Sequence, residues 1–334
     1  MILASLQRSK INQREVGKMK KVVFLMVLML LVGAGLFAEQ IVIGYACRRL
    51  TNPYWVMTKN GVEDAAAKYG VKVILYDCQN DPAIQRNNVE DLIQAKVDAI
   101  LITSIVTGSR ASGAAADAAV RAGIPVIGVD TSCGSPRVAV TIRTDNVLGG
   151  RLAGKYIAEE LNGKGKVIVL EGPAGDTNSA LRVGGFKEVI AKYPNIKIVA
   201  SQPADWSRVK GLNTMENLLQ AFPDVDAVFG ANDEMALGAI EALKAARKLK
   251  TTIVVGFDAT PDALKSIKAG KMSATIQQHP YEEGYRAVEL AIKILRGEPF
   301  ESKVVMRPWP WGMEHAIEIP ATLIDANNVD KYLK

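Results

Sequence analysis

An apolar segment that ends in an aspartate occurs twice in this chain and constrains its fold more than any other feature. One copy runs through Gly256 into Asp258, and the other ends at Asp130. The two aspartates are 128 residues apart, and Asp98 and Asp226 have the same separation of 128 residues. Short β-branched segments without polar alternation are typical of central parallel strands, and open α/β sheets place their ligands beyond the carboxyl ends of such strands. The repeat therefore predicts two similar α/β lobes whose strand-end carboxylates meet at one cleft.

Strand-like and helix-like segments alternate along the rest of the chain. We expect strands at 41–46, 71–76, 99–103, 124–129, 138–142, 167–170, 196–200, 227–230, 252–255 and 272–276. Helical patterns occupy most of the intervals, and a long amphipathic helix is expected near 281–295. This alternation predicts two doubly wound, parallel-sheet lobes.

Residues 1–38 have the pattern of an export signal. Two lysines precede a 15-residue apolar segment at 22–36, which is shorter than the ~20 residues that a membrane span needs. We expect translation to start at Met19 and cleavage to occur near Ala38. The mature protein is then predicted to be soluble and periplasmic.

Charge and cysteine content exclude several classes of function. Residues 1–38 hold six Lys and Arg and one acidic residue, so the remainder has 35 basic against 34 acidic side chains. A nearly neutral mature chain gives no reason to expect nucleic acid as a partner. Cys47, Cys78 and Cys133 lie on or just beyond predicted strands, so we expect buried free thiols, with a disulfide as the alternative in an oxidising compartment. No two of them have CxxC spacing and the chain has two histidines, so no metal site is expected. Neither GxxxxGKS/T nor a GxGxxG after the first strand is present, so no cofactor is expected.

Polar and aromatic residues gather where the predicted strands end. The candidates for ligand binding are Asn52, Tyr54, Trp55, Asp130, Asp145, Arg182, Trp206, Asn232, Asp258 and Gln278. Planar amide, carboxylate and guanidinium groups bind vicinal hydroxyls, and aromatic faces stack on sugar rings, so this set favours an uncharged polyol. No activated nucleophile, histidine base or metal cluster accompanies the set. We therefore expect no catalytic residues and predict that the chain is not an enzyme.

Four of these candidates have a structural alternative. Tyr54 and Trp55 are compatible with a hydrophobic cover on the sheet edge, and Asp145 with a helix N-cap. Arg182 is compatible with a surface ion pair. The residues alone leave these alternatives open.

Five segments, taken in order, resemble the periplasmic ribose/allose-binding proteins of ABC importers. They are 52–55 (NPYW), 145–150 (DNVLGG), 200–206 (ASQPADW), 232–238 (NDEMALG) and 255–258 (VGFD). The likeness spans nearly all of residues 40–310 and implies a type I periplasmic binding fold, in which two lobes joined by three crossovers close on a sugar. It implies an N-terminal lobe of 39–144 plus 279–307 and a C-terminal lobe of 145–278 plus 308–334. The crossovers are then expected near 144/145, 278/279 and 306/308.

The resemblance also implies a role for each candidate residue. Tyr54, Trp55 and Trp206 would enclose the sugar ring. The hydroxyls and the ring oxygen would be bound by Asn52, Asp130, Asp145, Arg182, Asn232, Asp258 and Gln278.

Two departures from the family pattern bear on the sugar. Thr131 stands where ribose-binding members have Arg, and Arg48 stands where allose-binding relatives carry Lys, so both are further candidate contacts. The tail around Trp309 and Trp311 also differs from the short ending of ribose binders. The ligand stays open among xylose, ribose, allose and other aldoses, with inositol or another small polyol as the alternative.

The resemblance implies a monomeric receptor that delivers a monosaccharide to an ABC permease, and it leaves a chemoreceptor as a further partner open. A sugar-responsive repressor would need an N-terminal helix-turn-helix where the apolar leader stands, so we reject that class. A dinucleotide enzyme is disfavoured by the missing phosphate motif and the missing acid/base pair.

Overall fold

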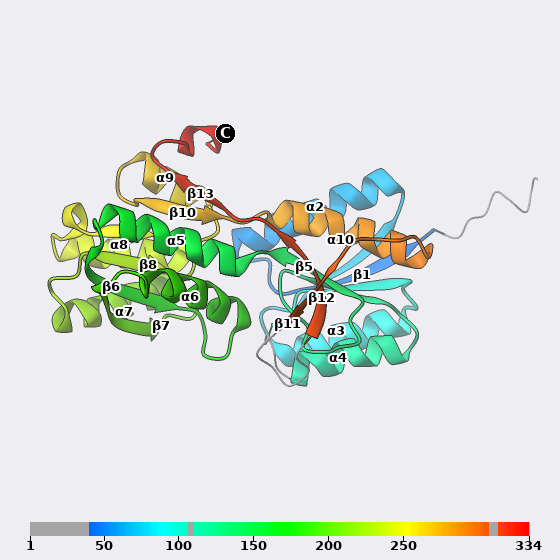
Figure 1. Cartoon of the computed structure of the whole chain (residues 1–334). Helices are drawn as coiled ribbons and strands as arrows, with labels where there is room; N and C mark the ends of the chain where they lie inside the picture. The colour runs from blue at the N-terminus through cyan, green and yellow to red at the C-terminus, as the bar shows by residue number, and fades with distance from the viewer. Residues whose placement is uncertain (1–39, 106–109, 307–312, 334) are drawn as a thin grey trace, which may run out of the picture. The chain divides into compact units, whose positions relative to one another are not determined.

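The computed structural model describes residues 40–105, 110–306 and 313–333 of the 334-residue chain. The predicted export signal, with its start at Met19 and cleavage near Ala38, lies outside the described residues, and so does the tail segment 309–311. Residues Val42–Lys334 form one compact unit, which contains two sheets (Figure 1). In the part of the chain that is described, no helix combines the length and apolarity needed to cross a membrane.

The first sheet has seven strands in the order β11-β12-β5-β4-β3-β1-β2. The strands are β1 (Val42–Cys47), β2 (Lys72–Asp77), β3 (Ala99–Ile102), β4 (Val126–Val129), β5 (Val140–Thr144), β11 (Lys303–Met306) and β12 (Met313–Ile319). All neighbours are parallel except β11 and β12. Its helices are α2 (Pro53–Tyr69), α3 (Pro82–Gln94), α4 (Arg110–Arg121) and α10 (Pro280–Leu295).

The second sheet has six strands in the order β13-β10-β9-β8-β6-β7, and only β13 is antiparallel to its neighbour. The strands are β6 (Lys164–Glu171), β7 (Asn195–Pro203), β8 (Ala227–Gly230), β9 (Ile253–Val255), β10 (Ala274–Gln277) and β13 (Thr322–Asp325). Its helices are α5 (Asn146–Glu160), α6 (Thr177–Ile190), α7 (Arg208–Ala221), α8 (Asp233–Ala245) and α9 (Pro261–Lys268). Two parallel-dominated α/β lobes confirm the predicted fold class.

The 128-residue repeat corresponds to equivalent contacts in the two lobes. The carboxylates of Asp98 and Asp226 each accept the backbone N–H of a residue at the start of the neighbouring strand, at 2.7 Å in both lobes. Asp130 and Asp258 each donate their backbone N–H to the next strand of the sheet, at 2.8 and 2.7 Å. The repeated residues therefore occupy equivalent positions at the two ends of equivalent strands.

The central strands of both sheets are buried along their whole length. Every residue of β3, β4 and β8 is buried, as expected where helices cover both faces of a parallel sheet. Close helix packing depends on glycine at one position that concerns the site. A Cβ on Gly150 of α5 would lie 2.0 Å from the carbonyl oxygen of Arg182 on α6. The absence of that carbon lets α6 lie against α5 and sets the position of Arg182.

Within the described ranges, the chain passes between the two sheets three times. The first passage follows Thr144 at the end of β5, and the second joins β10 to α10 through Gln278 and His279. The third lies between β12 and β13, because β12 pairs with β5 in the first sheet and β13 pairs with β10 in the second. This pairing moves the third passage from the expected 306/308 to about residue 320, so the expected C-terminal lobe segment 308–334 is split between the sheets.

A buried cation explains why β12 joins the first sheet. The side chain of Arg143 on β5 is 1% exposed and forms ion pairs with Glu314 and Glu318, which are four residues apart on β12. Residues four apart in a strand point to the same face, so both carboxylates reach the same guanidinium. Such a buried charge requires its partners, and these partners come from the tail of the chain.

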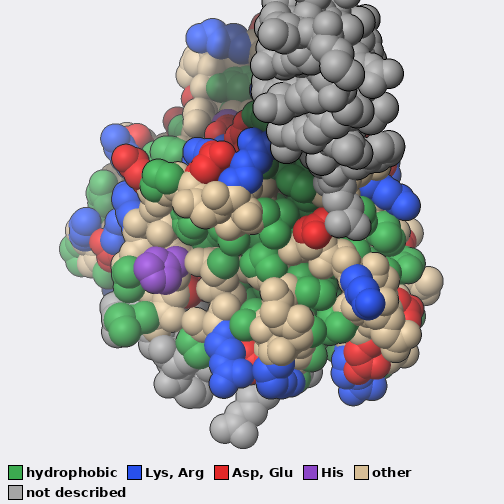
Figure 2. All heavy atoms as spheres, turned by 90° about the vertical axis from the view of Figure 1, so that its right-hand side faces the viewer, with side chains coloured by type: hydrophobic (Ala, Val, Ile, Leu, Met, Phe, Trp, Pro, Cys, Tyr) green, Lys and Arg blue, Asp and Glu red, His purple; other side chains and the backbone are tan. Residues whose placement is uncertain are grey.

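The surface agrees with the near-neutral charge of the chain after residue 38. On the face shown in Figure 2, Lys and Arg side chains are interspersed with Asp and Glu among the residues drawn in colour. A single-sign patch of the kind that binds nucleic acid is not seen among the coloured residues of that face. Inside the molecule, Cys47, Cys78 and Cys133 are buried free thiols, as predicted.

Candidate ligand-binding site

One pocket, open to solvent, collects residues from the carboxyl ends of strands in both sheets. Its lining residues are Arg48, Arg49, Asn52, Tyr54, Trp55, Asp130, Asp176, Asn178, Arg182, Trp206, Asn232, Asp258 and Gln278. Ten of the twelve candidate contacts are in this set. The prediction that the strand-end residues of the two lobes would lie together is therefore supported by the geometry.

The two repeated aspartates occupy strained backbone positions at the ends of their strands. Asp130 follows β4 with φ of 63°, and Asp258 follows β9 with φ of 125°. Such left-handed conformations cost about 1–3 kcal/mol each in residues other than glycine and are found mainly at functional sites. Both side chains are at least nine-tenths buried, so the strain directs two carboxylates into the cavity region.

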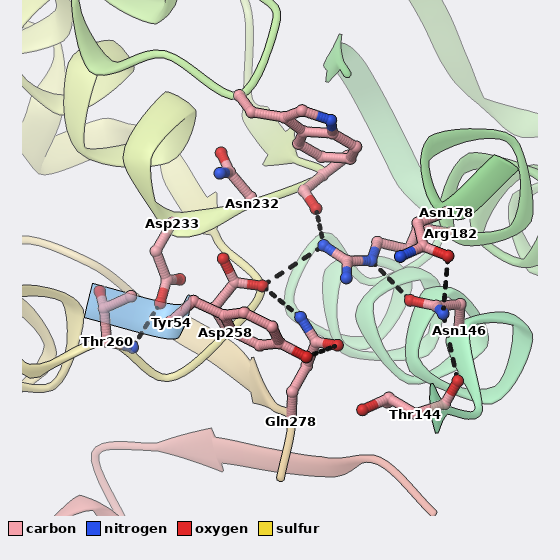
Figure 3. A network of polar contacts seen from close by, with 12 residues as sticks. Tyr54, Thr144, Asn146, Asn178, Arg182, Asn232, Asp233, Asp258, Thr260 and Gln278 are labelled. Atoms are coloured by element: carbon pink, nitrogen blue, oxygen red, sulfur yellow. Dashed lines mark hydrogen bonds and ion pairs between the residues drawn. The ribbon is translucent and has the colours of Figure 1, made fainter. Parts of the chain in front are cut away.

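Arg182 of α6 lies at the centre of the polar network in Figure 3. Its Nε donates to Oδ1 of Asn146 at 2.7 Å, and its Nη1 donates to the carbonyl oxygen of Ala231 at 2.9 Å and to Oδ1 of Asp258 at 3.3 Å. The guanidinium carbon lies 3.9 Å from the ring centre of Phe257. Because Arg182 is only 4% exposed, the alternative of a surface ion pair is wrong.

The strand-end carboxylates are already partly satisfied by protein donors. Asp130 accepts from the Tyr54 hydroxyl at 2.7 Å and from Nδ2 of Asn178 at 3.1 Å. Asp258 accepts at Oδ1 from both Arg182 and Nε2 of Gln278, the latter at 2.5 Å. Burial raises the pKa of both carboxyl groups, and the positive charge of Arg182 acts against that rise. The Asp130–Asn178 bond also joins a residue of the first lobe to a residue of the second.

Three aromatic side chains line the cavity. Tyr54 and Trp55 open α2 and pack edge to face, with ring centres 4.7 Å apart. Trp206 follows β7 in a left-handed conformation, with φ of 59°, and its indole N–H donates to Asp176 at 3.4 Å. Its ring centre lies 5.4 Å from the guanidinium carbon of Arg182. Since Tyr54 and Trp55 line the cavity, they do not serve only as a cover for the sheet edge.

Helix capping fixes the orientation of two amide side chains. Oδ1 of Asn52 accepts the backbone N–H of Tyr54 at 2.9 Å at the start of α2. Oδ1 of Asn232 accepts the backbone N–H of Met235 at 2.9 Å at the start of α8. Asn232 is therefore the N-cap of α8, and the adjacent Asp233 is the first residue of the helix. Since each Oδ1 is used in the cap, Nδ2 is the group that remains to donate into the cavity.

Two candidate residues do not reach the cavity. Asp145 is the N-cap of α5, and its Oδ1 accepts the backbone N–H of Leu148 at 2.9 Å. Thr131 turns its hydroxyl toward the carbonyl oxygen of Ser104 at 3.0 Å. Thr131 and Asp145 therefore have structural roles and do not contribute to the cavity wall.

Three lining residues were missed by sequence reasoning. Arg49 follows Arg48 on the loop after β1, and its buried Nε has no hydrogen-bond partner among the described residues. Asp176 caps α6, with its Oδ1 accepting the N–H of Ser179 at 3.0 Å. Asn178 lies in the first turn of the same helix. Their common signal is position, since each follows the carboxyl end of a strand as the other candidates do.

The charges on the cavity wall balance. The lining set contains three arginines and three aspartates, together with amide and aromatic groups. Among the described residues, no group of three or more His, Cys, Asp and Glu is arranged to hold a metal ion. A wall with equal numbers of cations and anions suits an uncharged ligand rich in hydrogen-bonding groups.

Comparison of the sequence with known proteins shows relatives along most of the chain. The family profile described as Periplasmic binding protein domain matches residues 43–299. The ribose import binding protein RbsB of Escherichia coli is 45% identical over 254 residues, which cover 76% of this chain and 84% of that protein. The D-allose-binding periplasmic protein of Escherichia coli is 34% identical over 255 residues, which cover 73% of this chain and 81% of that protein.

Solved structures extend the likeness across both lobes. An ABC transporter solute binding protein from Bacillus halodurans with bound myo-inositol has a TM-score of 0.79 at 31% identity, covering 88% of this chain and 97% of that chain. An ABC transporter periplasmic solute binding protein from Actinobacillus succinogenes with bound D-allose has a TM-score of 0.77 at 30% identity, covering 88% of this chain and 100% of that chain. The order of the motifs, the two-lobe fold and the matched family profile agree, and this chain belongs to the periplasmic binding protein domain family.

Proposed function

We propose that this protein is an exported receptor that captures a monosaccharide between its two lobes and delivers it to an ABC permease. The observation that carries the proposal is a pocket at the strand ends of both lobes with three arginines, three aspartates and three aromatic side chains on its wall. Opposite charges that balance within the wall can hydrogen-bond many hydroxyl groups without selecting a net charge. Similarity to proteins named for ribose import and for D-allose binding supports the same class of ligand.

The wall provides a distinct set of groups for a sugar. Nδ2 of Asn52 and Nδ2 of Asn232 are the donors that capping leaves, and Oδ2 of Asp258 is the carboxylate oxygen that Arg182 and Gln278 do not use. Carboxylates accept from hydroxyls and arginines donate to them, so a vicinal diol fits between the two kinds of group. The faces of Trp55 and Trp206 provide stacking surfaces for the C–H faces of the ring.

The ligand class includes pentoses and other aldoses, with xylose, ribose and allose as the first candidates. Thr131 does not contribute a cation at the end of β4, and Arg48 contributes one from the loop after β1. This redistribution of positive charge distinguishes the wall from the ribose-type pattern with Arg after the first strand-end aspartate. An inositol or another cyclic polyol is the alternative ligand, since a solved relative holds myo-inositol.

Binding without catalysis fits the groups on the wall. The cavity contains no histidine or cysteine among its lining residues, and its carboxylates are engaged by Arg182, Gln278, Asn178 and Tyr54. We therefore propose a transport receptor and not an enzyme. It acts in the periplasm after removal of residues 1–38, as a monomer, with a chemoreceptor as an additional partner to be tested.

A thermal-shift screen of the purified protein tests the proposal. The ligands are a panel of pentoses, hexoses and inositols, each added in large excess. A ligand at about 100 times its Kd stabilises the folded state by about 2.7 kcal/mol, which gives a clear rise in Tm. One strong response that is lost in Asp258→Asn supports the proposal and names the sugar. No response to any polyol would contradict it.

A further inference from the structure

A buried glutamate lies behind the cavity wall and contacts a residue that lines it. Glu283 is in the first turn of α10, directly after the second passage between the sheets, and it is fully buried. Its Oε1 accepts from the hydroxyl of Thr144 at 2.8 Å. Its Oε2 lies 3.1 Å from the hydroxyl oxygen of Tyr54. Glu283 therefore links the first and second passages between the lobes to an aromatic residue of the ligand site.

Three acceptor oxygens surround the Tyr54 hydroxyl, which has a single proton to donate. The Tyr54 hydroxyl oxygen lies 2.7 Å from Oδ1 of Asp130, 3.1 Å from Oε2 of Glu283 and 3.2 Å from Oε1 of Gln278. A phenol has one proton to donate and accepts at its oxygen. The shortest contact assigns that proton to Asp130. The contact with Glu283 is then a hydrogen bond only if Glu283 carries a proton and donates it to the phenol oxygen.

The charges around Glu283 favour the same assignment. Burial raises the pKa of Glu283 to about 8, and the Asp130 carboxylate adds to the rise, while the contacts with Thr144 and Tyr54 and the charge of Arg182 act against it. Among the described residues Glu283 forms no ion pair, and Arg182, whose charge acts on it, is paired with Asp258. A buried carboxyl group without a cation is more stable as the neutral acid.

We propose that Glu283 is a positioning residue that stays protonated in the binding-competent protein and fixes the hydroxyl of Tyr54 toward Asp130. The chain of donation runs from Thr144 to Glu283, from Glu283 to Tyr54 and from Tyr54 to Asp130. With Tyr54 held at Oδ1 and Asn178 at Oδ2, Asp130 accepts a ligand hydroxyl at the lone pairs that these two donors leave. Glu283 thus sets the direction of one ligand-facing carboxylate without touching the ligand. This inference rests on the proposed function, because the affected property is affinity for a sugar.

Loss of the proton from Glu283 should weaken binding on the alkaline side. Two buried carboxylates would then compete for the single proton of Tyr54, and one of them would be left without a donor. The contribution of protonated Glu283 to affinity should be complete well below pH 8, and above pH 8 the affinity should fall by about tenfold per pH unit, as expected when binding requires one proton. Asp130 and Asp258 act in the opposite sense, because they accept hydrogen bonds as carboxylates and lose that capacity when pH falls. The pKa of Tyr54 is raised well above 10, so the phenol does not titrate in this range.

Titration calorimetry of wild type and Glu283→Gln, with the sugar identified by the screen, tests the proposal between pH 6 and pH 9.5. A glutamine amide donates to Tyr54 and accepts from Thr144 as the neutral acid does. Glu283→Gln should bind within about threefold of wild type at pH 7 and should show no loss above pH 8. Glu283→Leu, which can neither donate nor accept, should bind at least about tenfold more weakly than Glu283→Gln at every pH.

Three outcomes would overturn the inference. They are a wild-type affinity that is flat to pH 9.5, an alkaline loss that persists in Glu283→Gln, and equal affinities of the Gln and Leu variants. If no sugar binds wild type, the proposed function fails, but the protonation state of Glu283 can still be measured in the free protein. The carboxyl carbon NMR signal that is absent in Glu283→Gln should titrate near pH 8 in the free protein. A signal that titrates below pH 6 would show that Glu283 is ionised at neutral pH and would overturn the inference.

Discussion

Gly172→Ala should displace the indole of Trp206 and weaken sugar binding without touching the sugar. Gly172 follows β6, and a Cβ built on it would lie 2.2 Å from Cζ2 and 2.4 Å from Cε2 of Trp206. Non-bonded carbons are at rest about 3.5–4.0 Å apart, so the ring would have to move by more than about 1 Å. The indole is rigid, and its residue already has a left-handed backbone conformation. The movement must therefore be made by the whole ring.

Two costs follow from this displacement. Overpacking of a buried contact destabilises proteins by about 1–3 kcal/mol. The bond from Nε1 of Trp206 to Asp176 is already 3.4 Å long, so a shift of about 1 Å breaks it and removes about 1 kcal/mol. We expect a loss of stability of about 2 kcal/mol and, since the stacking face moves with the ring, a loss of affinity of about tenfold.

Urea unfolding and calorimetry measure these two effects, and a second substitution separates them. Trp206→Phe removes part of the ring that the new Cβ meets, so Gly172→Ala should cost little stability in the Trp206→Phe background. The double variant should still bind sugar no better than Trp206→Phe alone. A Gly172→Ala protein with wild-type stability, wild-type affinity and an unchanged tryptophan spectrum would refute the packing argument. An equal decrease in the free energy of unfolding on Gly172→Ala in wild type and in the Trp206→Phe variant would also refute the packing argument.

Three further predictions concern the ligand site and the first sheet. Asp258→Ala should abolish sugar binding in calorimetry while the circular dichroism spectrum stays that of the folded protein, because the site needs a carboxylate from the second lobe. Trp206→Ala should weaken binding by about 1–3 kcal/mol and should reduce the sugar-dependent change in tryptophan fluorescence. Arg143→Met should lower the free energy of unfolding by about 3–5 kcal/mol in urea, because it leaves two carboxylates at a buried site without their cation. Arg151→Met is its matched control, since the Arg151 ion pair is about half exposed and should contribute less than about 1 kcal/mol.

Each of these has an outcome that contradicts it. Unchanged affinity in Asp258→Ala would remove the strand-end aspartate from the site. A full fluorescence response in Trp206→Ala would place the signal in another tryptophan. Equal destabilisation by the Arg143 and Arg151 substitutions would show that burial does not decide the strength of the ion pair.

The local sequence was sufficient to predict the strands and helices and most of the residues that line the site. The segments that end at Asp130 and Asp258 are apolar throughout, and the rule that ligands bind beyond the carboxyl ends of parallel strands placed both aspartates together. The structure adds that both have positive φ, which the side-chain pattern does not encode. Asp145 satisfied the same rule and yet caps α5, because an aspartate before a helix has two uses and only the direction of its side chain distinguishes them.

The missed residues show what a one-dimensional pattern omits. Asn178 lies within a helix, and its contact with Asp130 depends on how α6 of one lobe approaches the end of β4 of the other. Glu283 reads as a polar residue in the first turn of an amphipathic helix, although it is fully buried. Both contacts join residues more than 40 positions apart, so no local pattern identifies the partner of either residue.

The sequence by itself determined the fold class, the repeat, the edge of each sheet where a ligand binds and the chemical character of the wall. These properties follow from hydrophobic periodicity and from residue type, and both are local. Only the tertiary structure decided that β12 belongs to the first sheet, because that choice depends on two distant carboxylates reaching Arg143. It also decided which polar groups face the cavity and which are used in capping, since each choice is made by the shape and charge of the residues that surround it.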